Sequence, residues 1–268
     1  VTYMEIEAPF VAHKAKAGQF IIFRVDDKSE RVPLTIAGYD REKGTVTIIF
    51  QIVGQTTERL NELNAGDSLQ DFVGPLGKAS HFEGVRTAAV IGGGLGTAIA
   101  YPQAKKLHSM GVKVDMINGF RNKELVIIED ACKAACTNLY TMTDDGSNGN
   151  KGFVTAKLEE LIQAGNQYDV VIAIGPLVMM RAVCELTRQY GIKTIVSMNP
   201  VMIDGTGMCG GCRITVGGET KFACVDGPDF DGHQVDFDQA IRRSKMFAEG
   251  ERRSREAHHC RLEGMDHA

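Results

Sequence analysis

Three cysteines and one aspartate gather in a glycine-rich segment toward the end of the chain. Cys209 and Cys212 form a Cys-x-x-Cys pair, Cys224 follows after a short turn at residues 216–219, and Asp204 lies five residues before Cys209. Such a pair can hold a metal from one loop, and glycines leave backbone N–H groups free to contact cluster sulfurs. A fourth ligand is needed, and Asp204 is the nearest anionic candidate. The pattern favours an iron-sulfur cluster, with a structural zinc site or simple buried thiols as alternatives.

A glycine-rich segment at residues 92–97 is the second stretch whose residue types can do chemistry. It comes directly after an apolar run at 87–91 and directly before a stretch with helical spacing. Glycines in such a turn let the backbone approach a pyrophosphate, and the helix N-terminus supplies free N–H groups and positive potential. This context favours a dinucleotide-binding loop over a structural turn. Its candidate contacts are Gly92, Gly93, Gly94, Gly96 and Thr97.

Two further segments lie where buried strands are expected to end. Asp144 follows the run at 139–142, and Gly175 with Pro176 follows the run at 170–174. The carboxyl ends of parallel strands form the ligand crevice of an open sheet. We therefore assign these residues to the same dinucleotide site, although each alone also fits an ordinary turn.

A third candidate site lies in the β-rich first part of the chain. A Pro-Leu-Thr strand can present backbone groups to a flat heterocycle, and a Thr-rich helix start can hold a phosphate. The residues alone leave core packing and turns as an equal alternative. The candidates are Pro33, Leu34, Thr35, Gly54, Thr56, Thr57, Gly74 and Gly77.

The elements that must position these residues fall into three parts. Residues 1–82 show short β-branched runs and turn signals, which predict an antiparallel β-barrel interrupted by a helix at 56–63. Residues 83–199 alternate buried runs with helical stretches, which predicts a parallel, helix-covered sheet. Residues 200–268 form a glycine- and cysteine-rich subdomain that becomes polar and helical after 228. The expected strands are 20–25, 45–53, 87–91, 112–117, 139–142, 170–174 and 193–198, the last of them closing the sheet at 199–200.

Composition narrows the classes of partner. The 268 residues carry a formal net charge of −4 and a pI near 6.0, which argues against a nucleic-acid or polybasic membrane partner. No apolar run approaches the ~18 residues of a membrane span, and the first residues lack a signal-peptide pattern, so we expect a cytoplasmic protein. The sequence starts at Val1, so we expect N-terminal residues to be missing. We expect Cys260 to be an unligated surface cysteine and three others to be core residues: Cys132, Cys136 and Cys184.

The order of barrel, dinucleotide domain and cysteine loop resembles the ferredoxin-NADP reductase superfamily. The resemblance covers essentially the whole chain and is closest to the branch of dihydroorotate dehydrogenase electron-transfer subunits and NADH-dependent reduced ferredoxin:NADP oxidoreductase or sulfide dehydrogenase small subunits. Its most specific stretches are residues 204–212, 222–228 and 230–233. Two positions depart from the pattern: Arg31 lies one place before the usual flavin arginine, and Thr97-Ala98 stands where the family often has Ala-Pro.

The resemblance implies the cofactors and their sites. FAD would lie along Pro33–Thr35 with its pyrophosphate at Gly54, Thr56 and Thr57, and NAD(H) would lie near Gly92–Gly96. A 2Fe-2S cluster would be held by Asp204, Cys209, Cys212 and Cys224. Since the dihydroorotate branch uses four cysteines, the aspartate favours the ferredoxin-linked branch. NADH is favoured over NADPH, although Arg121 and Lys123 follow a strand end and are available to a 2′-phosphate.

The implied activity is electron transfer. Nicotinamides exchange two electrons as a hydride, iron-sulfur clusters exchange one, and a flavin can do both, so no catalytic acid or base is expected. The resemblance implies a heterodimer with a larger flavin and 4Fe-4S subunit, reaching ferredoxin indirectly and coupled to electron bifurcation. The alternatives are the electron-transfer subunit of another NAD-linked dehydrogenase, of dihydroorotate or sulfide type, and a non-enzymatic redox or nucleotide sensor.

Overall fold

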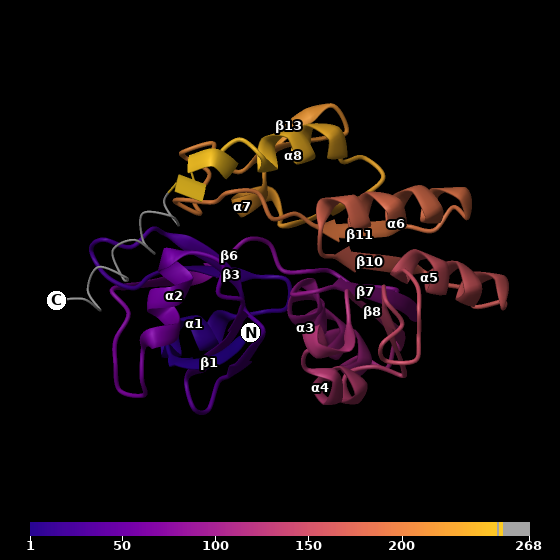
Figure 1. The fold of residues 1–268 in the computed structure, drawn as a ribbon, viewed down its shortest axis with the longest axis horizontal. Coiled ribbons are helices and arrows are strands. Elements are labelled where there is room, and N and C mark those ends of the chain that lie inside the picture. The colour runs from indigo at the N-terminus through magenta and orange to yellow at the C-terminus, as the bar shows by residue number, and fades with distance from the viewer. Residues whose placement is uncertain (251, 254–268) are drawn as a thin grey trace.

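The first domain is built from two small antiparallel sheets packed around one core. The computed structural model describes residues 1–250, 252 and 253. The sheets have strand orders β1-β5-β4 and β3-β2-β6, and they form the left part of the molecule in Figure 1. The elements are β1 (Thr2–Glu7), α1 (Pro9–Lys14), β2 (Phe20–Arg24), β3 (Val32–Thr35), β4 (Gly38–Asp40), β5 (Thr45–Phe50), α2 (Gln55–Glu62) and β6 (Asp71–Leu76).

Strands β2 and β5 supply the centre of this domain's core. Ile21 and Phe23 of β2 and Ile48 and Phe50 of β5 are fully buried, and Leu60 of α2 packs against them. The predicted helix at 56–63 is confirmed as α2. The predicted strand at 45–53 is too long, because the ladder with β1 ends at Phe50 and the chain turns there toward α2.

The second domain is a doubly wound sheet with strand order β14-β11-β10-β7-β8-β9. Helices α3 and α4 pack on one face, where they share a core with Val90 and Ile172. Helices α5 and α6 pack on the other face, against Ile91 and Ala173, because successive strand residues point to opposite sides. The elements are β7 (Thr87–Gly93), α3 (Gly96–Ser109), β8 (Lys113–Phe120), η1 (Lys123–Leu125), α4 (Glu129–Ala134), β9 (Asn138–Thr143), α5 (Val154–Gln163), β10 (Val170–Ile174), α6 (Leu177–Gln189) and β11 (Thr194–Ser197).

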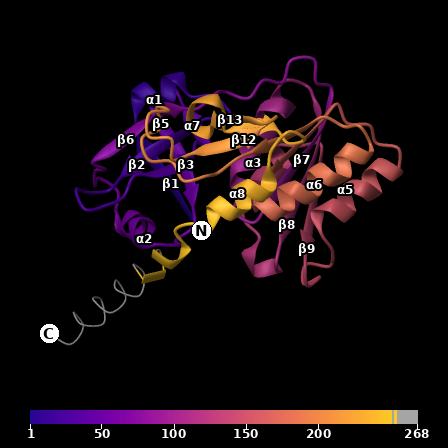
Figure 2. The ribbon, with the colours of Figure 1, turned by 90° about the horizontal axis from the view of Figure 1, so that it is seen from above.

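The C-terminal part lies across both domains (Figures 1 and 2). Its elements are β12 (Arg213–Val216), β13 (Glu219–Phe222), α7 (Ala223–Asp226), β14 (Asp229–Asp231) and α8 (Phe237–Ser244). Gly217 and Gly218 join β12 to β13 with φ values of +61° and +80°, as a two-residue hairpin turn requires. The predicted turn at 216–219 is therefore confirmed.

Two predictions about the C-terminal part need correction, and the first concerns β14. It pairs antiparallel with β11, so the sheet does not close at the predicted last strand but gains an edge strand from beyond it. The helix expected after residue 228 begins only at Phe237. This edge strand ties the cysteine-bearing segment to the second domain through main-chain hydrogen bonds.

Asp229 joins the three parts of the molecule at one point. Its carboxylate accepts hydrogen bonds from Ser80, in the segment between the first two domains, and from Gln103 of α3, whose Nε2 lies 3.1 Å away. Gln103 is almost fully buried. The place where the three parts meet is therefore polar around Asp229, and we call this contact the polar seam.

Two predictions about individual segments have contrasting outcomes. Cys132, Cys136 and Cys184 are buried, as predicted, whereas Cys260 lies outside the described residues.

In the part of the chain that the structure describes, no helix has the length and apolar character of a membrane span.

Candidate functional site

The glycine loop between β7 and α3 is fixed by close backbone contacts. A Cβ added at Gly96 would overlap the carbonyl oxygen of Ile174, and one added at Gly92 would lie 2.6 Å from the Cα of Thr97. Only glycine fits these two places, because the neighbours are backbone atoms that cannot turn aside. Gly94 has a φ of +56° and faces open space, so the loop presents bare backbone at the start of α3.

One of the two predicted crevice loops meets the glycine loop, as expected for adjacent parallel strands. A Cβ at Gly175 would lie 3.0 Å from the Cα of Gly93, so the loop that continues through Pro176 abuts the glycine loop. Asp144 follows β9, which is two strands away from β7 in the same sheet. It therefore lies on the same carboxyl edge but at some distance from the glycine loop.

Thr97 lies beneath the loop rather than on its surface. Its side chain is fully buried, its backbone N–H donates to the carbonyl of Gly94 at 3.1 Å, and its hydroxyl has no hydrogen-bond partner among the described residues. The described geometry thus gives Thr97 a place in the packing of the turn. Its contact with a dinucleotide stays a prediction.

The candidate flavin residues lie on β3 and at the start of α2. Pro33, Leu34 and Thr35 are all half-buried. The Thr57 hydroxyl accepts hydrogen bonds from the backbone N–H groups of Val53 and Gly54 at 3.0 and 3.1 Å and donates to the carbonyl of Gly54 at 2.8 Å. Thr57 therefore shapes the helix start.

The three glycines predicted for the flavin site have different surroundings. A Cβ at Gly54 would meet nothing within 4 Å, so there is open space beside it, while its N–H and carbonyl groups are hydrogen-bonded to Thr57 and Glu58. A Cβ at Gly74 would lie 2.6 Å from Cγ2 of Ile21, and one at Gly77 would lie 3.0 Å from the carbonyl oxygen of Gly227. Packing alone therefore explains glycine at Gly74 and Gly77, and their place in a cofactor site stays a prediction.

Two of the three clustered cysteines form a buried pair. The sulfurs of Cys212 and Cys224 lie 3.3 Å apart, and both residues are about 1% exposed. Burial and, to a lesser degree, the neighbouring Cys212 raise the pKa of the Cys224 thiol to about 12. The backbone N–H of Gly207 acts in the opposite direction by hydrogen bonding to this sulfur.

Asp204 and Cys209 form the second pair, nearer the surface. The Asp204 carboxylate accepts hydrogen bonds from the backbone N–H groups of Thr206, Met208 and Cys209 at 3.0 to 3.1 Å. Desolvation raises the pKa of Asp204, but hydrogen bonds from the backbone and side chains of Thr206 and Cys209 outweigh it and lower the pKa to about 2. The carboxylate is therefore anionic at neutral pH, as a metal ligand must be.

The donor set fits a two-iron cluster better than a single metal ion. No group of three or more His, Cys, Asp or Glu side chains in residues 1–250, 252 and 253 surrounds one point as ligands of one ion. Instead the candidate ligands come as two pairs, and each iron of a 2Fe-2S cluster would take two protein ligands. A tetrahedral zinc site would require all four around one centre.

The full spacing of the candidate ligands carries a signal that the sequence analysis, which used only the Cys-x-x-Cys pair and the nearness of Asp204, missed. Asp204, Cys209 and Cys212 are separated by four and then two residues, with Cys224 farther along. This is the plant-type ferredoxin spacing, with aspartate in place of the first cysteine. The signal is available from the sequence alone.

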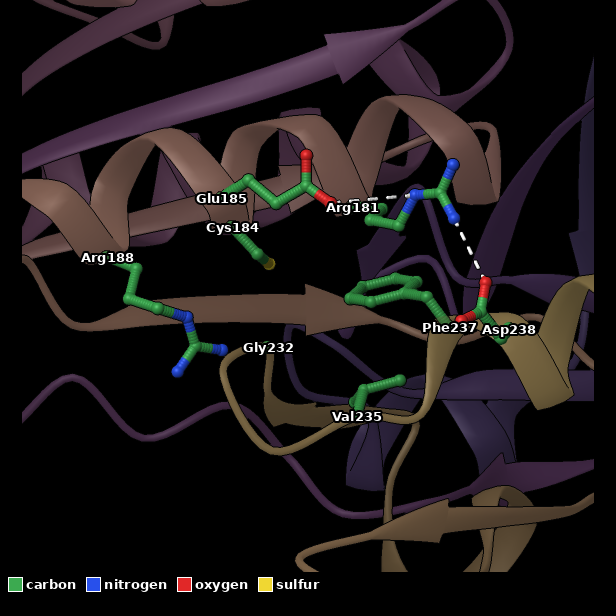
Figure 3. Close-up of a pocket in the computed structure, with 8 residues that line it drawn as sticks. All are labelled: Arg181, Cys184, Glu185, Arg188, Gly232, Val235, Phe237 and Asp238. Atoms are coloured by element: carbon green, nitrogen blue, oxygen red, sulfur yellow. Dashed lines mark hydrogen bonds and ion pairs between the residues drawn. The ribbon is translucent and has the colours of Figure 1, made fainter.

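A separate hollow of about 190 Å³ lies between α6 and the C-terminal part (Figure 3). The Arg181 guanidinium lies 3.1 Å from Asp238 and 3.8 Å from Glu185, while Arg188 donates to the carbonyl of His233 at 2.7 Å. These charges are satisfied by one another and by backbone. The ion pair of Arg181 with Asp238 therefore joins α6 to α8, and none of the predicted site residues lines this hollow.

Comparisons with known proteins agree with this architecture. Residues 199–236 match the family model described as the iron-sulfur cluster binding domain of dihydroorotate dehydrogenase B. The chain is 41% identical, over 94% of its length and 88% of the relative, to the dihydroorotate dehydrogenase B (NAD(+)) electron transfer subunit homolog of Thermotoga maritima. It is also 54% identical to a Clostridium beijerinckii protein of the adh 3′ region, with 91% of this chain and 85% of the relative covered.

A solved structure gives the same result for the fold. A chain of the NADH-dependent reduced ferredoxin-NADP oxidoreductase superimposes with a TM-score of 0.90 at 39% identity, with 95% of this chain and 92% of that chain covered. The fold and the cysteine loop define a ferredoxin-reductase-like protein with an iron-sulfur subdomain. The chain belongs to the family of dihydroorotate dehydrogenase B electron-transfer subunits, and the predicted resemblance and fold class are confirmed.

Proposed function

We propose that this chain passes electrons between NAD(H) and a larger partner subunit by way of FAD and a 2Fe-2S cluster. The observation that carries the proposal is the direct packing of the cysteine loop on the barrel. A Cβ at Gly205, next to Asp204, would lie 2.7 Å from Leu76 of β6 and 2.9 Å from Ile22 of β2. The loop and the barrel strands also share one buried core. Such proximity supports electron transfer between a barrel cofactor and a loop cofactor.

The chain's own residues would bind and orient the cofactors. Bound FAD exchanges a hydride with a nicotinamide and single electrons with a cluster. Strand β3 and the start of α2 would hold the flavin, while the glycine loop and the start of α3 would hold the dinucleotide pyrophosphate through backbone N–H groups. Asp204, Cys209, Cys212 and Cys224 would hold the cluster.

The exposed side of the cysteine loop supports an exit for electrons to a partner. Cys209 is exposed, and the adjoining Met208 is 88% exposed. A ligand near the surface shortens the distance to an acceptor in another protein. We propose that the acceptor is a larger flavin and 4Fe-4S subunit, in an electron-bifurcating NADH-dependent ferredoxin:NADP oxidoreductase.

The solved relative supports this choice of complex, because its description names both flavin-based electron bifurcation and NADH-dependent reduced ferredoxin-NADP oxidoreductase. The Thermotoga maritima relative supports a second candidate, the electron-transfer subunit of a dihydroorotate dehydrogenase. Asp204 favours the first candidate, because the resemblance implies four cysteine ligands in the dihydroorotate branch. Co-purification of the partner subunit from the native cell, followed by assay with ferredoxin or dihydroorotate, distinguishes the two.

The proposal is tested by anaerobic purification with cofactor analysis and reduction by NADH, then NADPH. We expect a flavin spectrum, about two irons and two sulfides per chain as in a 2Fe-2S centre, and rapid bleaching by NADH. Zinc without flavin would overturn the proposal. Slow or absent flavin reduction by both nucleotides would favour a redox sensor.

A further inference from the structure

Three arginines from three different elements donate to backbone carbonyls of the loop at residues 203–211. Arg31 Nε lies 2.8 Å from the Ile203 oxygen. Arg213 Nη1 lies 3.0 Å from the Gly210 oxygen. Arg243 Nη2 lies 3.1 Å from the Gly211 oxygen. We call Arg31, Arg213 and Arg243 the arginine clamp.

Each contact fixes a part of the loop that carries a candidate ligand. Ile203 directly precedes Asp204, and Gly210 with Gly211 separates Cys209 from Cys212. The arginines are far apart in the sequence: Arg31 directly precedes β3, Arg213 begins β12 and Arg243 lies near the end of α8. The loop therefore takes its shape from side chains of the barrel, the hairpin and the C-terminal helix together.

The clamp also brings positive charge to the loop. Asp71 lies 3.4 Å from Arg31 but 2.7 Å from Arg24, so one carboxylate is shared between two guanidinium groups. Arg213 and Arg243 form no ion pair with any carboxylate of the described residues. Arg243 and Arg31 are half-buried, whereas Arg213 is exposed.

This charge bears on the redox equilibrium of a cluster in the loop. A 2Fe-2S cluster with three thiolates and one carboxylate is anionic, and adding one electron, with no transfer of atoms, makes it more so. Positive charge nearby stabilises the reduced form, and does so more strongly where the surroundings are partly buried.

We propose that the arginine clamp consists of positioning residues that fix the ligand loop and raise the reduction potential of its cluster. The inference rests on the proposed function, since it requires a cluster held by Asp204 and the three cysteines. It adds a determinant of the cluster potential that lies outside the ligand set.

The test uses the full-length protein, purified anaerobically, with dithionite as reductant and electron paramagnetic resonance to follow the reduced cluster. The variants are Arg243→Gln, Arg31→Gln and Arg213→Gln. We expect Arg243→Gln to lower the equilibrium constant for cluster reduction about three- to tenfold, where tenfold is about 59 mV for one electron. Arg213→Gln has the smallest effect, because water and salt screen an exposed charge.

A matched control removes a positive charge without touching the loop. Arg242→Gln changes the neighbouring residue of α8 and should keep the wild-type potential. Arg243→Lys keeps the charge and should restore most of the potential, whereas Arg243→Gln should also alter the shape of the resonance signal.

The outcomes separate the two proposals. Loss of iron from Arg243→Gln but not from Arg243→Lys or Arg242→Gln supports the positioning role. Wild-type potentials in all three glutamine variants with full iron content overturn the inference, as does an equal shift in Arg242→Gln and Arg243→Gln. Wild-type protein that lacks iron and sulfide overturns the proposed function itself, and the clamp with it.

Discussion

The glycine loop at residues 92–97 and the cysteine loop at residues 203–212 are positioned in different ways. The first lies at the end of β7, and its geometry is fixed by backbone atoms such as the Ile174 carbonyl and the Thr97 Cα. The second has no regular structure and is held by arginine side chains and by packing on the barrel. The first loop is therefore fixed by main-chain packing and the second by side-chain contacts.

This difference has a physical consequence. Main-chain packing between adjacent strands leaves a dinucleotide loop little freedom, which suits a site that must present the same N–H groups to every ligand. A loop held by side chains can be adjusted one contact at a time. Its electrostatic surroundings can then be tuned without changing the ligands.

The largest effect is expected from removing a buried candidate ligand, Cys224 of α7. Cys224→Ser should abolish cluster retention, because the hydroxyl is a far weaker anionic ligand than the thiolate. Iron and sulfide should fall from about two each to near zero, as for a lost 2Fe-2S centre. Flavin content and reduction by NADH should persist, which cofactor analysis and stopped-flow spectroscopy will measure.

Cys136→Ser is the matched control for this variant. Cys136 is also buried, and burial raises the pKa of its thiol to about 11, but it donates to the carbonyl of Cys132 and lies in the dinucleotide domain. Its iron content should equal that of the wild type. Full retention of iron by Cys224→Ser would remove Cys224 from the ligand set.

The next largest effect concerns the glycine loop at residues 92–97. Gly96→Ala should destabilise the protein by about 1–3 kcal/mol, because the new methyl group meets a backbone oxygen rather than a movable side chain. It should also weaken NADH binding at least severalfold while leaving the cluster intact. Urea denaturation and a fluorescence titration with NADH will measure the two changes.

Gly111→Ala provides the comparison at the opposite end of α3. Gly111 has a φ of +81° and open space around its Cα, so alanine there strains the backbone without a collision. It should cost about 1 kcal/mol and leave NADH affinity unchanged. Equal NADH affinities in Gly96→Ala and Gly111→Ala would show that the glycine loop is not the dinucleotide site.

The position of the glycine loop was also easier to predict from sequence than the contacts of the cysteine loop. Strand periodicity located β7 and β10, and the glycines between strand and helix follow from rules of local geometry, so the positions of these loops could be predicted from sequence. Their place in a dinucleotide site stays a prediction. The buried position of Thr97 was not, because a surface-facing and an inward-facing threonine have the same local pattern. The candidate ligands were found through residue type and spacing.

The long-range contacts could not be predicted in this way. Nothing in the sequence links Arg31 to Ile203 or Arg243 to Gly211, because these pairs are far apart along the chain and share no periodic pattern. Strand β14 was missed for a similar reason. It is only three residues long, too short for a period-2 signal, and its place beside β11 is set by tertiary packing.

The smallest expected effect concerns Asp229, which lies where the three parts of the molecule meet. It is a change in how thermal stability depends on pH. Burial raises the pKa of Asp229, against the lowering effect of hydrogen bonds from Ser80, Ser197 and Gln103. A carboxyl whose folded pKa is raised stabilises the fold most below its ordinary pKa of about 3.9 and loses that contribution as pH rises through the folded value. Asp229→Asn should therefore raise the thermal midpoint by a few degrees at pH 7, and this gain should vanish toward pH 4.

Asp169→Asn is the control of opposite sign. Backbone N–H groups of Arg86 and Thr87 lower the pKa of Asp169, so its contribution is present at neutral pH and is lost as pH falls through the folded value. This variant should lower the midpoint at pH 7, with the difference shrinking as the medium becomes acidic. Thermal melts of both variants from pH 4 to pH 8 will measure the two slopes. A parallel response of the two variants would mean that the Asp229 carboxyl is solvated, and that packing rather than the polar seam joins the dinucleotide domain to the cysteine loop.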